Sequence, residues 1–204
     1  MNVKTIPVGM LAMNCYIVSD TTKEALIIDP GNEPDRLIDF IESEGLMPKL
    51  ILLTHGHYDH IEAVNTMKSR YGIPCFVHKE DQPLMEGVHW SRYLGRPFDT
   101  VQIDGGFDEA SVFEFGNLSI SILHTPGHSP GSCSFQIETA LFTGDTLFAN
   151  GGVGRTDLWK SSYDDIQNSI VNKLFLLEDG CLVYPGHDES STIGKEKQIH
   201  LGIN

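Results

Sequence analysis

Three histidines and one aspartate crowd into six residues of this chain, directly after an apolar run at residues 50–53. The cluster reads Thr54-His55-Gly56-His57-Tyr58-Asp59-His60. In a regular strand or helix these side chains cannot all point at one metal ion, but on a tight loop they can divide between two neighbouring ions. Imidazole and carboxylate ligands without thiolate suit zinc, iron, manganese or cobalt, and an open coordination position is typical of catalysis. The cluster therefore predicts a catalytic metal centre.

Composition limits the class of partner. The chain has 204 residues and a net charge of −14, from 28 acidic and 14 basic residues, with no basic run. Nucleic-acid affinity depends on clustered lysine and arginine, so we expect no nucleic-acid partner. The N-terminus has no apolar signal core and no apolar stretch long enough to cross a bilayer, so we expect no membrane partner. The four cysteines lie far apart in apolar surroundings, which is typical of reduced thiols in a cytoplasmic protein.

The order of strand-like and helix-like stretches predicts one domain over residues 1–204, with two mixed sheets packed together and helices outside. Gly116-Asn117 predicts a hairpin turn. Residues 87–97 lack periodicity and indicate an aromatic loop, either over a cleft or against the core. We expect helices at 33–44, 60–71 and 163–177. We expect strands at 3–8, 15–18, 25–28, 50–53, 75–78, 112–115, 118–123, 132–137, 140–142 and, last in the chain, 181–184.

Three later strands end in a shared pattern. Each is apolar, is followed by a turn that contains glycine, and then presents a single polar residue: His128, Asp145 or His187. Glycine lets the backbone approach closely and frees the next side chain to point inward. Three such endings at one sheet edge are improbable by chance, so we expect these three residues to complete the metal centre.

The His-x-His-x-Asp-His string with these three distal residues resembles the metallo-β-lactamase superfamily over nearly the whole chain. The resemblance implies an α/β (α+β) fold, a four-layer αββα sandwich of two mixed β-sheets flanked by helices, with the site at one edge. It also implies two divalent metal ions, with zinc favoured and iron or manganese as alternatives. The implied ligands are His55, His57 and His128 for one ion, Asp59, His60 and His187 for the other, and Asp145 as a bridge between them.

Within the superfamily, residues 143–148, 154–157 and 191–196 resemble small glyoxalase II-like hydrolases. This implies a metal-dependent thioester hydrolase, similar to hydroxyacylglutathione hydrolases, in which activated water attacks a small thioester or ester carbonyl. Asp59 is the expected catalytic residue, orienting the water and accepting its proton. Full-length glyoxalase II carries a C-terminal helical domain that contacts glutathione. This chain ends about seventeen residues after His187, so we expect no such domain and weak glutathione binding.

One alternative activity stays open, that of a persulfide dioxygenase, and Arg155 has two possible roles. Residues 154–157 also resemble persulfide dioxygenases of the superfamily, which would use a single iron at His55, His128 and Asp145. Arg155 either pairs with an acidic residue to fix its loop or binds a substrate carboxylate. Secreted β-lactamases fit less well, because they need a signal peptide and lack an aspartate at the position of Asp145.

Overall fold

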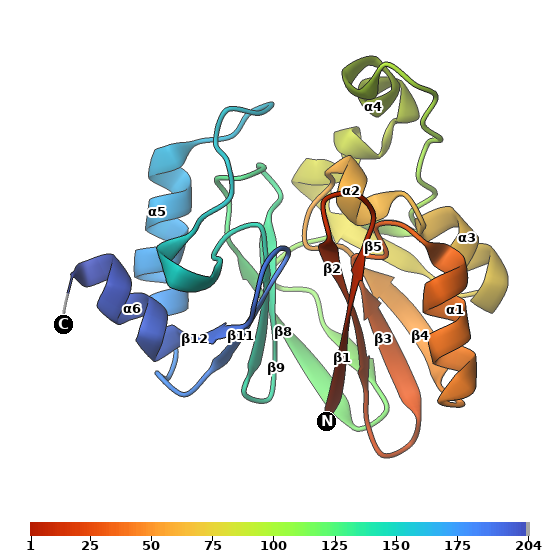
Figure 1. Cartoon of the computed structure of the whole chain (residues 1–204), viewed down its shortest axis with the longest axis horizontal. Helices are drawn as coiled ribbons and strands as arrows, with labels where there is room; N and C mark the ends of the chain where they lie inside the picture. The colour runs from red at the N-terminus through yellow and green to blue at the C-terminus, as the bar shows by residue number, and fades with distance from the viewer. Residues whose placement is uncertain (203–204) are drawn as a thin grey trace.

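The computed structural model describes residues 1–202 as two six-stranded sheets packed face to face, with helices on both outer faces (Figure 1). Helices α1 (Pro34–Ser43) and α3 (Val64–Tyr71) cover the first sheet, and α5 (Tyr163–Asn172) and α6 (Ile193–Leu201) cover the second. The four-layer sandwich expected from the sequence is confirmed. No helix among the described residues is long and apolar enough to cross a membrane.

The first sheet combines an antiparallel meander with three parallel pairings. Its strands lie side by side in chain order, and β1 to β3 are antiparallel, whereas β3 to β6 are parallel. Parallel neighbours need long crossovers, which here carry the helices. The strands are β1 (Asn2–Val8), β2 (Met13–Ser19), β3 (Glu24–Ile28), β4 (Met47–Leu52), β5 (Cys75–His78) and β6 (Gly105–Phe107).

The second sheet is mostly antiparallel, and its strands also lie in chain order. The predicted hairpin at Gly116-Asn117 joins its first two strands, and α5 lies in the crossover between β10 and β11, which are parallel. The strands are β7 (Phe113–Phe115), β8 (Leu118–His124), β9 (Cys133–Ile137), β10 (Ala140–Gly144), β11 (Leu182–Pro185) and β12 (Ser191–Thr192).

Two inner strands carry continuous apolar runs, residues 25–28 of β3 and 50–52 of β4, and both faces of these runs are buried. Leu26 and Leu52 point between the sheets and pack with Phe142 of the opposite sheet. The alternate residues Ile27 and Ile51 point outward, into a separate core under α1 and α3. The strand ends are thereby held rigidly, and the loops that carry the polar cluster start from these ends.

Two expected helices are divided in the structure. The stretch 60–71 forms α2 (Tyr58–Ile61) and α3, because the backbone N–H of Ala63 donates to the carbonyl of Pro30 (3.0 Å) instead of continuing the first helix. The stretch 163–177 ends as α5 at Asn172 and continues as the 3₁₀ helix η3 (Leu174–Leu176).

Two further expectations about local structure were wrong. Residues 87–97 are not a loop but include the helix α4 (Gly87–Leu94), whose buried Trp90 donates its indole N–H to the carbonyl of Leu84 (2.7 Å). Strand β11 is not the last one, because β12 and then α6 follow it. The structure also has the 3₁₀ helices η1 (Lys79–Met85) and η2 (Ala149–Gly151), which the sequence analysis did not anticipate.

Candidate metal centre

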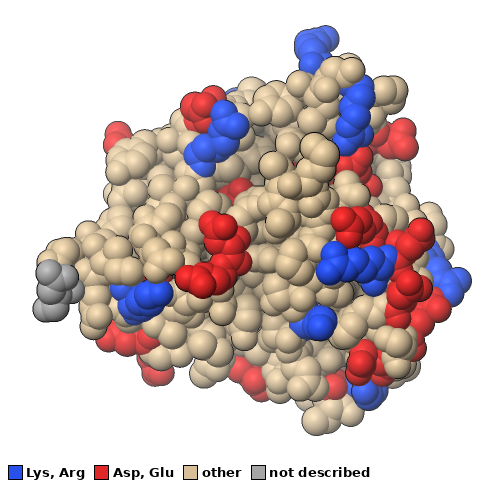
Figure 2. Space-filling view, in the orientation of Figure 1, with Lys and Arg blue, Asp and Glu red and all other residues tan. Residues whose placement is uncertain are grey.

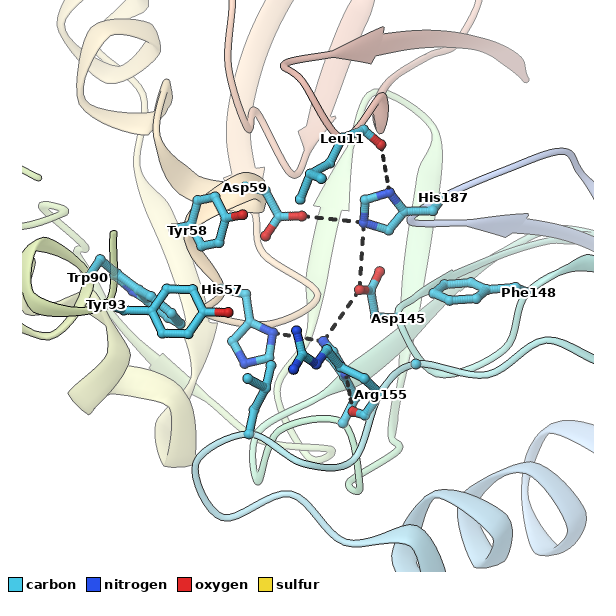
Figure 3. Close-up of a pocket in the computed structure, with 13 residues that line it drawn as sticks. Leu11, His57, Tyr58, Asp59, Trp90, Tyr93, Asp145, Phe148, Arg155 and His187 are labelled. Carbon is cyan, nitrogen blue, oxygen red and sulfur yellow. Dashed lines mark hydrogen bonds and ion pairs between the residues drawn. The ribbon is translucent and has the colours of Figure 1, made fainter. Parts of the chain in front are cut away.

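All seven residues predicted to bind metal gather at one end of the two sheets, although they come from five separate places in the fold. Figure 3 labels four of them, His57, Asp59, Asp145 and His187, around a cavity. The seven follow strand ends or open a short helix: His55 and His57 after β4, Asp59 and His60 in α2, His128 after β8, Asp145 after β10, and His187 at the turn after β11.

Three histidines form the first donor cluster. One ring nitrogen from each of His55, His57 and His128 lies within 4.8 Å of the others, and all three residues are buried. The Nδ1 of His57 and the Nε2 of His128 are 2.7 Å apart. This tri-histidine cluster joins the first sheet to the second, since His128 alone comes from the second.

Asp59, His60 and His187 form the second donor cluster, in which one donor atom from each also lies within 4.8 Å of the others. The Nε2 of His187 lies 3.3 Å from Oδ2 of Asp59. Asp145 stands between the clusters: its Oδ1 lies 3.3 Å from Nε2 of His60, and its Oδ2 lies 3.3 Å from Nε2 of His128. Asp145 thus lies within reach of both clusters, and its role as a bridge, which the resemblance implies, stays a prediction.

Hydrogen bonds on the far side of the rings set which nitrogen faces the centre. His128 donates from Nδ1 to the carbonyl of Arg155 (2.8 Å), and His187 donates from Nδ1 to the carbonyl of Leu11 (3.2 Å). Because a carbonyl oxygen only accepts, the hydrogen sits on Nδ1 and Nε2 presents its lone pair to the centre. The Nδ1 of His60 lies 2.9 Å from Oδ2 of Asp29, which gives His60 the same orientation.

Several polar atoms of the cluster are buried without a hydrogen-bond partner. They are Nε2 of His55, Nε2 of His60 and Oδ1 of Asp145. An unsatisfied buried polar atom costs about 1–3 kcal/mol, so three of them in one place indicate a missing partner. Lone pairs from imidazole and carboxylate that converge in this way suit a divalent cation. The residues present therefore fit the metal ions that the sequence led us to expect.

The electrostatics of the cluster hold some of its donors, but not all, in the forms that bind metal. Burial and the nearby His60 lower the pKa of His55 well below its ordinary value, and burial with His128 lowers the pKa of His57 to about 3. Burial opposes a charge on Asp145, yet the surrounding histidines, led by His60, outweigh it and hold its pKa well below the ordinary value.

Neutral imidazole and ionised carboxylate are the protonation states that metal ligation requires. Burial opposes a charge on His60 and His187, yet the carboxylates of Asp145 and Asp59 outweigh it and raise the pKa of both histidines above the ordinary value. These two histidines must therefore release a proton when a metal ion binds.

Asp29 forms hydrogen bonds with residues of the Thr54–His60 stretch, and it was not among the residues predicted from the sequence. Its carboxylate accepts from the backbone N–H of Thr54 (2.7 Å), from the Thr54 hydroxyl (2.6 Å) and from His60 (2.9 Å). The Thr54 hydroxyl in turn lies 3.1 Å from Nδ1 of His55. A signal was present, because Asp29 directly follows the apolar strand β3, just as the predicted residues follow theirs.

Close approach of the backbone explains one of the glycines before a predicted ligand. A Cβ atom on Gly186 would lie 2.1 Å from Oδ1 of Asp145 and 2.9 Å from Cε1 of His60. No side chain fits there, so glycine at this position is a direct requirement of the cluster. This agrees with the reason given for the glycine turn before His187.

The cluster opens into a cavity of about 290 Å³ with a largely aromatic wall. Trp90 stands with its ring centroid 5.5 Å from that of His57. Arg155 also lines the cavity, but its Nε and Nη2 bind the carboxylate of Asp157 at 2.6 and 2.8 Å. Of the two roles expected for Arg155, the structure shows the pairing with an acidic residue of its own loop. The other cavity residues drawn in Figure 3 include Leu11, Tyr58, Tyr93 and Phe148.

Comparison with known proteins places this geometry in a family. A family model described as the metallo-beta-lactamase superfamily matches residues 8–187. The hydroxyacylglutathione hydrolase GloC of Haemophilus influenzae is 38% identical, with 100% of this chain and 99% of the relative covered. The crystal structure of the BLEG-1 B3 metallo-beta-lactamase is 37% identical with a TM-score of 0.92, covering 97% of each chain.

A second solved structure carries metal. The structure of TTHA1623 in a di-iron-bound form is 33% identical with a TM-score of 0.87, covering 98% of this chain and 100% of that one. The sandwich fold, the His/Asp cluster suited to divalent metal ions and the full-length matches agree with one another. The chain belongs to the metallo-β-lactamase superfamily.

Proposed function

We propose that this protein is a metal-dependent hydrolase of small acyl thioesters and esters, similar to glyoxalase II. The observation that carries the proposal is the arrangement of two donor clusters on either side of one carboxylate, Asp145, at the bottom of a cavity. The full-length similarity to a hydroxyacylglutathione hydrolase supports the same reaction class.

The proposed ligand sets are those that the resemblance to the superfamily implies. His55, His57 and His128 would hold one ion, Asp59, His60 and His187 the other, and Asp145 would contact both. When bound, such ions lower the pKa of water and polarise a carbonyl oxygen. Zinc is the ion we favour from the ligand types, and iron is the principal alternative, given the di-iron form of the similar TTHA1623.

Asp59 is the residue we propose to orient the attacking water and accept its proton. It lines the cavity, and its side chain is only 15% exposed. Burial opposes its charge, but His60 and His187 lower the pKa of Asp59 below its ordinary value, so it is a carboxylate at neutral pH. A thiolate leaving group needs little protonation, because thiol pKa values are about 8.5, so this reaction does not require a separate general acid.

The shape of the cavity favours substrates with an apolar arm. A second cavity of about 470 Å³ adjoins the first, and the two share His57, Trp90, Tyr93 and Leu158 as lining residues. The second cavity continues to Trp159. Arg155 is engaged by Asp157, so few cations are available for the two carboxylates of glutathione. We therefore propose small acyl thioesters whose apolar arm enters the second cavity as substrates, with weak binding of the glutathione carrier.

Steady-state kinetics of the metal-loaded protein on a matched panel of thioesters tests this function. We expect hydrolysis of S-lactoylglutathione with a high KM, and a larger effect on kcat/KM from changing the acyl group than from changing the thiol. A low micromolar KM for the glutathione thioester would overturn the weak-carrier argument. Oxygen uptake with glutathione persulfide, without thioester hydrolysis, would replace the hydrolase by the mononuclear-iron alternative.

Hydrolysis of β-lactams is a second candidate, although the sequence analysis had set it aside. The observation that favours it is the similarity to the BLEG-1 B3 metallo-beta-lactamase along nearly the full chain. A chromogenic cephalosporin assayed beside the thioester panel separates the two. We expect thioester turnover to exceed β-lactam turnover by at least about tenfold in kcat/KM; the reverse ratio would make the β-lactamase the better assignment.

We propose the cytoplasm as the compartment, a single domain over residues 1–204, and no nucleic-acid or membrane partner. All four cysteines are buried and unpaired. On the face shown in Figure 2 the basic side chains are scattered, and most lie beside acidic ones rather than in a cluster. Fractionation of cells and a nucleic-acid retention assay at low salt would check these assignments.

A further inference from the structure

A fully buried aspartate lies on η1, outside the proposed ligand set. Asp81 is 0% exposed, whereas its neighbours Lys79 and Glu80 are exposed. Its Oδ2 accepts from the backbone N–H of Gly56 (2.9 Å) and from the hydroxyl of Ser129 (2.6 Å). Its Oδ1 accepts from the backbone N–H of Gly131 (2.7 Å). One side chain thus takes three hydrogen bonds from two distant loops.

Those two loops are the ones that carry the tri-histidine cluster. Gly56 separates His55 from His57, and Ser129 directly follows His128. The first loop leaves β4 of the first sheet, and the second leaves β8 of the second sheet. The carboxylate of Asp81 therefore ties together the loops whose separation decides where the three ring nitrogens meet.

Both loops have a glycine where η1 packs against them, and neither position has space for a side chain. A Cβ atom on Gly131 would lie 2.7 Å from Cγ of Asp81, and one on Gly56 would lie 2.7 Å from Cβ of Leu84. Neither glycine adopts a positive φ, so it is space rather than backbone conformation that requires glycine here. Each loop is shaped to admit η1.

We infer that Asp81 is a positioning residue for the tri-histidine cluster, and this inference rests on the proposed metal centre. It holds the His55–His57 loop and the His128 loop at a fixed separation before a divalent ion binds. The two loops therefore lose their conformational entropy when the protein folds, and little more is lost when an ion binds. Groups that orient metal ligands in this way typically change metal affinity by about 10–100-fold when removed.

Asp81→Asn is the sharpest substitution, because it keeps the size of the side chain and changes its hydrogen bonding. The amide has one acceptor oxygen where the carboxylate has two, and its NH₂ group must face one of the three donors. With the amide oxygen in the place of Oδ2, only the bond from Gly131 is lost; with it in the place of Oδ1, the first loop loses its bond from Gly56. Either orientation therefore removes at least one of the three hydrogen bonds and sets an NH₂ group against a backbone N–H. Glu80→Gln is the matched control, since it removes the same charge from the adjacent, exposed position and breaks no hydrogen bond to either loop.

Chelator competition on the zinc-loaded protein measures the affinity of each ion. We expect Asp81→Asn to weaken one of the two ions by about 10–100-fold and to leave the other nearly unchanged, with Glu80→Gln like wild type. The weakened ion should be the one that His57→Ala removes. Equal weakening of both ions, or wild-type affinity for both, would overturn the inference. A wild-type protein that binds no divalent ion would instead overturn the proposed function on which the inference rests.

The melting temperature separates positioning from general stability. If Asp81 only stabilised the fold, Asp81→Asn would lower the melting temperatures of the apo and zinc-loaded forms equally. We expect the shift induced by zinc to be smaller than in wild type, because that shift follows metal affinity. Ser129→Ala removes the hydroxyl bond to Asp81, together with a bond to the Ser132 hydroxyl within the same loop, and is the variant to use if Asp81→Asn does not fold. A threefold or larger loss of affinity is expected from it, and an unchanged affinity would overturn the inference.

Discussion

The two sheets contribute to the candidate metal centre in different ways. The first sheet supplies four donors from one stretch, His55 to His60, on a single loop and the short helix α2. The second sheet supplies three donors, His128, Asp145 and His187, each from a different strand end. A local cluster can be recognised in a sequence without a fold, whereas the dispersed donors converge only when the sheet is formed.

The two groups of donors are also held differently. Two buried carboxylates hold the loop of the first sheet: Asp29, and Asp81, which also accepts two hydrogen bonds from the His128 loop of the second sheet. In the second sheet, main-chain carbonyls do more of this work: His128 donates to that of Arg155, and His187 donates to that of Leu11. We expect substitutions of these two carboxylates to disturb the centre more than substitutions of side chains in the second half of the molecule that contact no donor loop.

Asp145 belongs to both donor clusters, so its loss should have the largest effect. We expect Asp145→Ala to lower kcat/KM by at least about a thousandfold, equivalent to about 4 kcal/mol of transition-state stabilisation, and to reduce metal content at both positions. Metal analysis and kinetics on the same preparation check this. Full metal content with near wild-type turnover would reject a bridging role.

Removal of Asp29 tests the anchoring of the first loop. Asp29→Ala leaves the Thr54 N–H, the Thr54 hydroxyl and the His60 Nδ1–H without their acceptor. We expect unfolding free energy to fall by about 3–5 kcal/mol, with weaker metal binding as well. Urea unfolding, with the exposed Asp35→Ala as control, measures it. An equal, small loss in both variants would contradict the anchoring role.

Glu196 offers the matching test in the second half of the molecule. This buried carboxylate accepts from the backbone N–H groups of Asn150 (3.1 Å) and Gly151 (2.7 Å) in η2, which carries no proposed ligand. We expect Glu196→Ala to cost about 2–3 kcal/mol of stability while metal affinity stays at the wild-type value. Glu189→Ala, which removes an exposed bond to Asn150, should cost under about 1 kcal/mol. If Glu196→Ala also lost metal, loss of metal would no longer distinguish carboxylates that contact the donor loops from those that only stabilise the fold.

Part of this organisation follows from the sequence and part does not. The local string from His55 to His60 indicated four donors, the endings of three later strands indicated His128, Asp145 and His187, and the resemblance to a known superfamily implied how the seven divide between two ions. Asp81 was missed because it lies among Lys79, Glu80 and Gln82, which looks exposed until the two sheets close over it. Helix α4 is too short to show periodicity, and its main anchor, Trp90, is buried only by tertiary packing. Helix α6 was not predicted because one of its buried positions is the charged residue Glu196, which interrupts the apolar pattern of the helix.

A pH titration should show a smaller effect where the sheets meet away from the metal centre. His78 of β5 stacks on His124 of β8 with ring centroids 4.2 Å apart, and burial together with His124 lowers the pKa of His78 to about 4. The unfolded chain takes up this proton near pH 6.5 and the folded protein does not, so stability is lost as pH falls from about 6.5 towards 4.

His78→Gln removes this titration. We expect the variant to lose about 1–2 kcal/mol less stability than wild type between pH 7 and pH 5, as measured by urea unfolding at each pH. Parallel curves for the two proteins would show that the pair of histidines contributes nothing to the pH dependence.

Metal content per chain, compared among wild type, His57→Ala and His187→Ala, tests the central claim most directly. The protein should be purified without chelator or added metal. If each donor cluster holds one ion, wild type will contain close to two ions per chain, and each variant will keep close to one, in the cluster left intact. A single iron per chain that His187→Ala leaves in place would contradict the two-cluster account and favour a mononuclear centre.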